Sequence, residues 1–216
     1  MEETELMALW KSYDRKLEQN LVLNRKNTED ITRMKIGSLL GSMKPVKLFT
    51  IIIGILWIAF VDTIIIATWS YASPFFLVSA IIQVLLTKAA IVVYAYQIIL
   101  IYQTDISESL LKTQERIARL QSSTIQITRI LFLQFPVWTT FYISDALIKN
   151  GGVTFYLIQG VVTAVLTFLA WWFFTNIKFE NRDKNWFRLI FAGKEWEPTI
   201  HAMDLLGEIE GYKLVK

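Results

Sequence analysis

Residues 48–70 read LFTIIIGILWIAFVDTIIIATWS, and Asp62 is the one charged side chain among them. A helix needs about 20 consecutive apolar residues to cross the hydrocarbon core of a bilayer. Three more apolar runs of sufficient length follow, at 74–102, 126–148 and 153–177. The sequence therefore predicts an all-α membrane protein whose four transmembrane helices form two hairpins, with additional amphipathic or coiled-coil-like helices on the cytoplasmic side.

The distribution of basic residues predicts the orientation of these runs. Of the 22 Lys and Arg, nine lie in 1–47, four in 103–129 and seven in 178–216. The segments after the first and third runs together contain only Lys149. Since basic residues collect on the cytoplasmic side of membrane proteins, both termini are expected in the cytoplasm. The chain then divides into a cytoplasmic helix at 1–44, a transmembrane region at 45–177 and a cytoplasmic basic and aromatic tail at 178–216.

The composition disfavours several classes of function. The chain has no cysteine and a single histidine, His201, so a thiolate site or an all-protein zinc site is not expected. It contains no P-loop, GxGxxG, GxSxG or HExxH motif, so no cofactor, metal or catalytic residue is predicted. The pI near 9.0 is explained by membrane topology, and nucleic acid is not an expected partner.

The N-terminal segment is predicted to form a long helix with a heptad repeat. Two rows of side chains recur every seven residues, as in a coiled coil, although three of the eight positions are Asn. The alternative is an amphipathic helix packed on its own protein. Gly37, Gly41 and Pro45 are expected to break or bend the helix before the membrane. The rows are Trp10, Leu17, Asn24 and Ile31, and Tyr13, Asn20, Asn27 and Met34.

The loop between the second and third runs shows the same periodicity. It predicts a second cytoplasmic helix at 105–121, with Asp105 as its N-cap and the segment 121–124 as its end. Two seams of matching period suggest that this helix packs on the N-terminal one. The alternative is that it lies on anionic lipid through its basic side chains.

Polar residues inside the apolar runs are candidates for a functional site, because charges at membrane depth are costly. Counting ~1.5 Å per residue places them in two layers. One interpretation is a hydrated cavity or ion path that uses Asp62 and Lys88; the other is interhelical hydrogen bonding with Lys88 extending toward the inner surface. The outer layer holds Asp62, Gln83, Gln159 and Thr163, and the inner layer holds Lys88, Gln134, Thr167 and Gly54.

The stretch LWKSYDRKLE at 9–18, followed by LVLN at 21–24, resembles a recurring opening of small bacterial multi-pass inner-membrane proteins. Those proteins, mostly uncharacterised, begin with an LWxxYDxKLxxxLxLN helix and continue with several membrane spans. The resemblance implies the same architecture, a bacterial inner-membrane location and a shared cytoplasmic binding helix. It implies no activity and no catalytic residue.

The leading hypothesis is a membrane-anchored regulatory or scaffold protein. Its N-terminal helix would bind a cytoplasmic protein or a second copy of the chain, while the bilayer surrounds the apolar runs. The alternative is an oligomeric channel, pore-forming effector or small transporter that uses Asp62 and Lys88. An enzyme is the least favoured class, since the titratable groups do not converge. The candidate partner-binding residues are Trp10, Tyr13, Leu17, Asn20, Asn24 and Ile31.

Overall fold

A computed structural model describes residues 3–104, 110–193 and 196–214. Within these ranges the regular elements are all helices. They are α1 (Glu3–Thr68), α2 (Pro74–Gln103), α3 (Leu110–Phe132), α4 (Val137–Thr140), α5 (Asp145–Asn150), α6 (Val153–Asn176), the 3-10 turn η1 (Phe179–Asn181), α7 (Asn185–Ile190) and α8 (Glu197–Leu214).

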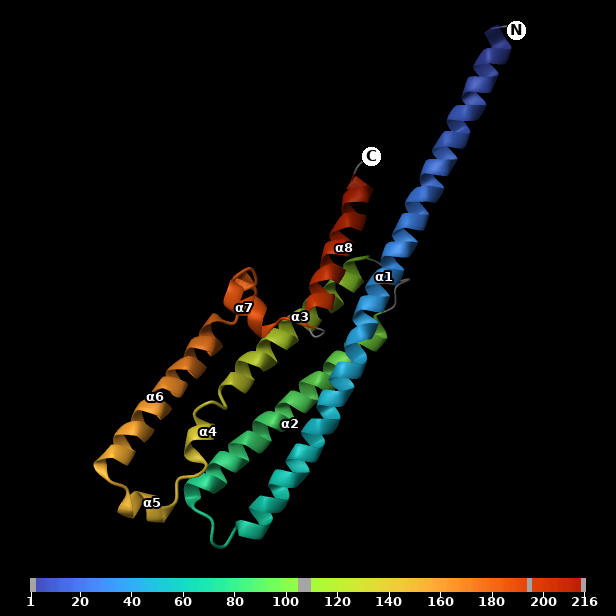
Figure 1. Cartoon of the computed structure of the whole chain (residues 1–216). Helices are drawn as coiled ribbons and strands as arrows, with labels where there is room; N and C mark the ends of the chain where they lie inside the picture. Colours follow the sequence, from blue (N-terminus) through green and yellow to red (C-terminus); the bar gives the residue numbers. More distant parts are fainter. Residues whose placement is uncertain (1–2, 105–109, 194–195, 215–216) are drawn as a thin grey trace.

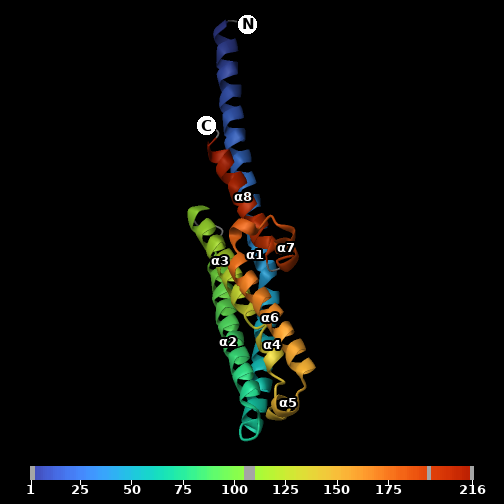
Figure 2. The ribbon, with the colours of Figure 1, turned by 90° about the vertical axis from the view of Figure 1, so that its left-hand side faces the viewer.

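The helices run back and forth along one long axis (Figures 1 and 2). The chain reverses at residues 69–73, and α2 returns beside α1; the segment from α3 through α5 runs down again, and α6 returns. We call the end with both chain termini the basic end, and the opposite end the turn end. Three helices are long and apolar enough to cross a membrane: α1 within Leu6–Thr68, α2 and α6. This finding supports an association with a membrane.

The structure does not form the predicted span at 126–148 as one helix. There α3 ends at Phe132, and only the short helices α4 and α5 follow before α6. Pro136 explains the break: it has no N–H to donate to the Phe132 carbonyl four residues earlier, and its ring would clash with that carbonyl. Tighter bonds replace the helical ladder, including Phe135 N–H to Phe132 O at 3.2 Å. The prediction of four continuous transmembrane helices is therefore not confirmed.

The expected break before the first span is also absent, because α1 continues through Gly37, Gly41 and Pro45 without ending. Packing on both sides of the proline accounts for this. Met43 and Lys47, which flank Pro45, are both fully buried. Tertiary contacts of this kind can outweigh the missing hydrogen bond, since the stability of most helices in proteins comes from packing.

The predicted helix at 105–121 is only partly comparable with the structure, because 105–109 lie outside the described residues, including the proposed N-cap Asp105. The described part, α3, does not end at 121–124 as expected. It continues to Phe132 and so joins the predicted cytoplasmic helix to the start of the predicted third span. The hydroxyls of Ser123 and Thr124 donate to the Leu120 carbonyl, so these residues are accommodated within the helix.

A packed core at the basic end joins four helices. Ile36, Leu40 and Met43 of α1 share this core with Ile117 and Leu120 of α3, but the described part of the 105–121 region packs chiefly on α2 and α8, not on α1 as expected. These residues of α1 come after the predicted heptad rows in the sequence, and they lie on a different face of the helix. Much of the contact comes from α8, which lies along α1 (Figures 1 and 2). Its contributions to this core are Ala202, Leu206 and Ile209, and α2 adds Ile101.

A second core fixes the segment after α6. Phe187 of α7 is fully buried and stacks on Phe191 with ring centroids 4.3 Å apart. Trp196 lies 5.0 Å from the Phe191 ring, and Ile177 at the end of α6 belongs to the same cluster. Burial of aromatic rings is a large stabilising contribution. The basic and aromatic tail predicted from the sequence is therefore partly a folded unit at the end of α6.

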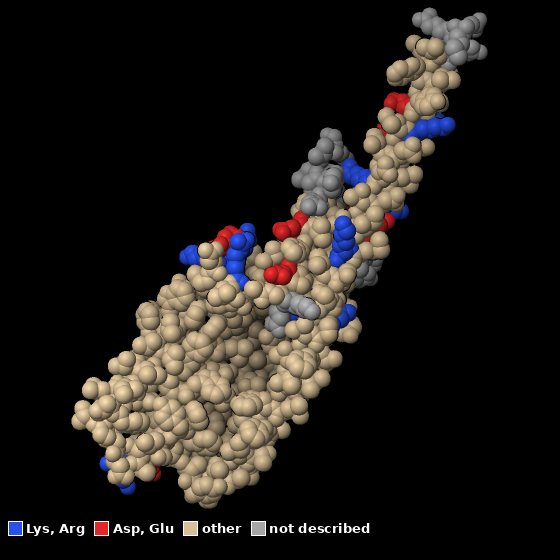
Figure 3. Space-filling model, viewed as in Figure 1, with Lys and Arg blue, Asp and Glu red and all other residues tan. Residues whose placement is uncertain are grey.

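Charged side chains gather at the basic end, and the face shown in Figure 3 is almost free of charge from there to the tips at the turn end. Several of these charges are paired along one helix. Arg119 Nη2 donates to Glu115 Oε1 at 2.7 Å, and this hydrogen bond together with the carboxylate charge raises the pKa of Arg119. Such exposed pairs add little stability. Their location matches an uncharged middle that suits a hydrocarbon environment.

Candidate functional site

Almost every side chain in the N-terminal part of α1, Leu6–Ile31, is exposed, and Glu29 near its base is half-buried. We call this part the N-terminal arm; Figures 1 and 2 show that its N-terminal portion projects beyond the end of α8. Trp10 keeps 73% of its surface exposed, and Tyr13, Leu17 and Ile31 are also exposed. Asn20 and Asn24 are exposed as well. All six predicted partner-binding residues thus lie on one uncovered helix.

The faces of α1 explain why the arm is uncovered. The residues of α1 that pack within the chain are Ile36, Leu40 and Met43. At 100° per residue, Ile31 and Met34 point about 140° and 160° away from Ile36. The heptad rows therefore run along a different side of the helix from the one that α8 and α2 cover. The packed half of α1 fixes the base of the arm.

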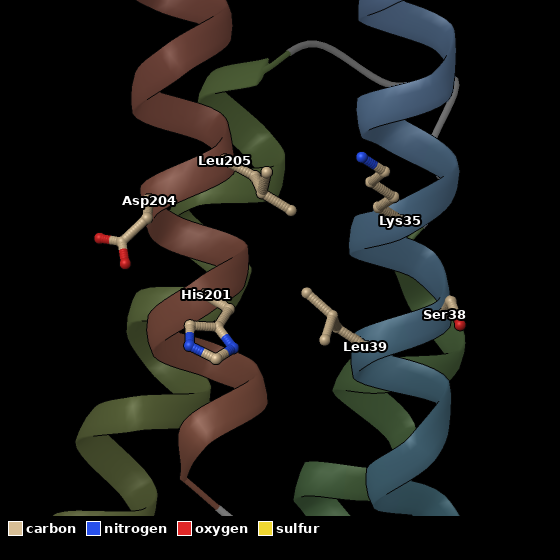
Figure 4. Close-up of a pocket in the computed structure, with 6 residues that line it drawn as sticks. All are labelled: Lys35, Ser38, Leu39, His201, Asp204 and Leu205. Atoms are coloured by element: carbon tan, nitrogen blue, oxygen red, sulfur yellow. The ribbon is translucent and has the colours of Figure 1, made fainter.

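A groove between α1 and α8 lies next to the base of the arm (Figure 4). It has a volume of about 490 Å³ and is lined from α1 by Lys35, Ser38 and Leu39. Leu39 and Leu205 face each other across it, whereas Asp204 points away from α1 and Ser38 lies on the side of α1 remote from α8. The groove is wide and its polar groups point in different directions. It is therefore the gap between two packed helices and lacks the converging polar groups of a preformed ligand site.

Asp62 and Lys88 form an ion pair between α1 and α2. Lys88 Nζ lies 3.7 Å from Asp62 Oδ2. Along the helices their heights differ by ~9 Å, but side chains lean toward the N-terminus of their own helix. Because α1 and α2 are antiparallel, these two side chains lean toward each other. Asp62 and Lys88, which were predicted to lie in two different layers, therefore reach each other through their side chains.

This ion pair lies on the outside of the bundle. Ser79 and Gln97 of α2 bond to Thr140 and to Ser123, and so face the α3–α4 segment. Lys88 is nine residues from each of them, which is half a turn away on a helix. The side chains of Lys88 and Asp62 are 53% and 42% exposed. Neither residue lines the cavity between α1, α2 and α4.

Gln159 and Thr163 of α6 come together with Thr139 of α4. Gln159 Nε2 donates to the Thr139 carbonyl at 2.6 Å, and the Thr163 hydroxyl donates to Thr139 Oγ1 at 3.0 Å. Tyr142 also donates to Gln159 Oε1. This cluster satisfies polar groups at the break between α4 and α5, where the backbone leaves the helical ladder. Its arrangement is suited to holding α6 against α4.

The remaining predicted intramembrane residues lie elsewhere. Gln83 lines a cavity of about 180 Å³ together with mostly apolar residues such as Trp57 and Trp138. Gln134 is half-buried in the turn before Pro136. Thr167 donates to the Thr163 carbonyl of its own helix. The structure thus gathers Gln159 with Thr163 and Asp62 with Lys88, and it does not assemble two complete polar layers.

A buried polar network at the basic end was missed from the sequence. Lys47 is fully buried, and its Nζ donates to Gln97 Oε1 at 2.6 Å. Gln97 Nε2 in turn donates to Ser123 Oγ at 3.0 Å and Thr124 Oγ1 at 3.2 Å. The Tyr94 ring lies 4.9 Å from the same ammonium. The network ties α1, α2 and α3 together where the apolar part of the bundle begins.

Two sequence signals pointed to this network. Lys47 directly precedes the first apolar run, and Gln97 is a polar residue inside the second. They lie 24 residues before and 26 residues after Tyr71, at the centre of the intervening turn. In an antiparallel pair of helices, residues equally far from the turn lie at the same height. Lys47 was instead counted only as a cytoplasmic topology charge.

The chain was compared with known proteins at three levels. No protein-family model matches it, and neither does any curated protein sequence or any solved structure. The geometry of the arm and of the helix faces is therefore the ground for a functional proposal.

Proposed function

We propose that this protein is a membrane-anchored regulatory or scaffold protein whose N-terminal arm binds another protein on the cytoplasmic side of the membrane. The partner is a cytoplasmic protein or a second copy of the chain. The observation that carries this proposal is the exposed apolar seam of the arm, with Trp10, Tyr13 and Leu17 on one side of an uncovered helix.

The energetics of an isolated helix support a partner. Most helical stability in proteins comes from the packing of an apolar face, not from intrinsic propensity. Large exposed side chains such as Trp10 and Tyr13 lose favourable burial as long as the arm stands alone. Aromatic side chains of this kind are also the ones that dominate protein–protein interfaces. A binding partner on the seam supplies the missing packing.

The mounting of the arm supports the same proposal. Ile36 and Leu40, next to the arm in α1, are buried in the core that α8 and α3 complete. The arm is therefore the continuation of a helix whose position is fixed by packing. Binding along the arm would affect the α1–α8 contact through this continuous helix. The many basic residues at this end favour a cytoplasmic location by the positive-inside rule.

Site-specific photocrosslinking tests the proposal in intact cells. Leu17 and Val22 are matched positions, 61% and 64% exposed, but they lie about 140° apart on the helix. A benzoylphenylalanine residue at Leu17 is expected to give an adduct of defined mass, and the same residue at Val22 is not. Replacing Trp10 and Tyr13 by Ala should abolish the Leu17 adduct while the protein remains in the membrane.

The identity of the adduct distinguishes the two kinds of partner. An adduct of twice the chain's mass indicates a second copy, and any other defined mass indicates a different protein; both support a binding arm. The absence of an adduct at Leu17, or equal adducts at Leu17 and Val22, refutes it.

A further inference from the structure

The heptad spacing of the arm does not stop at Met34. Alternating steps of four and three continue to the turn end of α1, and Asp62 lies 49 residues, or seven heptads, after Tyr13. On a straight helix this row drifts by about 20° per heptad, so two copies stay in contact along it only by coiling around each other. The positions reached beyond Met34 are half-buried or exposed in the described chain. Together with the eight heptad residues of the arm they form what we call the α1 seam. The additional members are Ser38, Gly41, Pro45, Leu48, Ile52, Ile55, Ala59, Asp62 and Ile66.

The opposite side of α1 is the one used within the chain. Leu40, Lys47 and Val61 are buried there and are spaced by multiples of seven. Gly54 shares this spacing, and a Cβ on it would lie 3.1 Å from Ile91 of α2. Gly41, on the α1 seam, would meet nothing within 4 Å. The chain's own packing thus accounts for Gly54 but leaves the space at Gly41 unused.

We infer that α1 pairs in parallel with the α1 of a second copy along this seam, from the arm into the membrane-spanning part. The inference rests on the proposed binding function of the arm and names its partner. A soluble partner would cover the arm but not the apolar positions from Leu48 to Ile66. A second copy covers both, and two copies inserted the same way in one membrane present their helices in parallel.

The residues along the seam suit such a pair. In-register pairing places Asn24 opposite the second copy's Asn24, an arrangement that fixes register in coiled coils. Asp30 and Lys35 are five residues apart, at flanking positions that face each other with opposite charge across a parallel pair; in a single copy the Lys35 side chain points toward α8 (Figure 4), so it must turn to make this contact. Ser38 and Gly41 are small, which allows two backbones to approach closely near the membrane boundary. Figure 4 shows Ser38 on the side of α1 remote from α8.

Pairing along the seam also accounts for the exposed ion pair. Asp62 is a seam position, and its Lys88 partner at 3.7 Å lies on the same outer side of the hairpin. In a single copy these charges face hydrocarbon, which is costly. A second copy brings the two ion pairs together as a neutral cluster of four charges and excludes lipid from them.

Single-cysteine crosslinking tests the inference, because the natural chain has no cysteine. Two matched comparisons are available: Leu17→Cys against Val22→Cys in the arm, at 61% and 64% exposure, and Ile52→Cys against Ile53→Cys in the span, at 49% and 48%. Only the first of each pair lies on the α1 seam. Oxidation in native membranes is expected to give on the order of tenfold more disulfide-linked dimer at Leu17 and Ile52, because a disulfide requires Cα atoms less than about 7 Å apart.

Each outcome decides the inference. Dimer at both seam positions and not at their controls supports it. Dimer at neither seam position, dimer at Ile52 without Leu17 or the reverse, or equal dimer at seam and control positions overturns continuous pairing. A photo-adduct of Leu17 with a different protein, without any disulfide dimer, overturns self-pairing but leaves the proposed binding function intact. Ile55→Cys against Leu56→Cys repeats the test in the span if an Ile52 variant fails to fold.

Discussion

Removing the Gln97 side-chain amide is expected to destabilise the protein through the buried Lys47 ammonium. Lys47 is fully buried, and its 2.6 Å hydrogen bond to Gln97 Oε1 is charge-assisted. A hydrogen bond to a charged group contributes about 1.5–3 kcal/mol net. In a chain of this size each kcal/mol shifts the melting temperature by about 2–4 °C. Gln97→Leu should therefore lower the melting temperature by roughly 3–12 °C.

Thermal unfolding followed by circular dichroism in a mild detergent measures this effect. The double variant Lys47→Met with Gln97→Leu should melt above Gln97→Leu alone, because replacing both bonded partners by apolar groups removes the buried charge together with this hydrogen bond. Gln103→Leu is the matched control, since Gln103 is also on α2 but exposed. Its effect should stay within about 0.5 kcal/mol.

Two results would refute this reasoning. If Gln97→Leu has the same melting temperature as the wild-type protein, the buried Lys47 ammonium does not depend on the Gln97 amide. If the double variant melts below Gln97→Leu alone, then Lys47 contributes mainly through contacts other than this bond.

Two further substitutions test the packing of the bundle. Phe187→Ala should lower the free energy of unfolding by about 3–5 kcal/mol, since the ring is fully buried against Phe191, while Leu189→Ala at an 82% exposed position should have almost no effect in the same melting assay. Gln159→Leu should lower the free energy of unfolding by about 0.6–1.7 kcal/mol, the range for interhelical hydrogen bonds in membranes. Thr167→Val should be close to neutral, because the Thr167 hydroxyl donates to the Thr163 carbonyl of its own helix. Equal losses for these two variants would contradict the interhelical role of Gln159.

Hydropathy was enough to predict the helices that need only length and apolar composition. The runs at 48–70, 74–102 and 153–177 match the end of α1, α2 and α6 to within two residues, and these three helices could all cross a membrane. The prediction of a transmembrane helix at 126–148 was not confirmed, because hydropathy takes no account of the backbone N–H that a proline lacks. The helix α3 ends four residues before Pro136, at the carbonyl that the proline cannot satisfy.

Polar contacts were predictable only where the geometry was simple. The spacing of Gln159 and Thr163 by four placed them on one face, and both meet Thr139. The acceptor of Gln159 could not be foreseen, because it is the Thr139 backbone carbonyl next to the break in the helix. Lys47 was missed for a different reason. The positive-inside rule assigned it to the cytoplasmic charges, whereas in the structure it is buried and donates a hydrogen bond to Gln97.

The division of α1 into two faces shows why periodicity alone could not assign its partners. Leu40, Lys47 and Val61 on the buried side repeat in sevens, as Trp10, Leu17 and Ile31 do on the uncovered side. Hydrophobicity does not rank the two sides, since the buried one contains a lysine and the uncovered one a tryptophan. The choice depends on the helices that pack there: α2 beside Lys47 and Val61, and α8, which reaches Leu40 from the far end of the chain. Once these helices occupy one side, the other must be covered by lipid, by water or by another chain, and its polar and charged members make lipid alone an unfavourable answer.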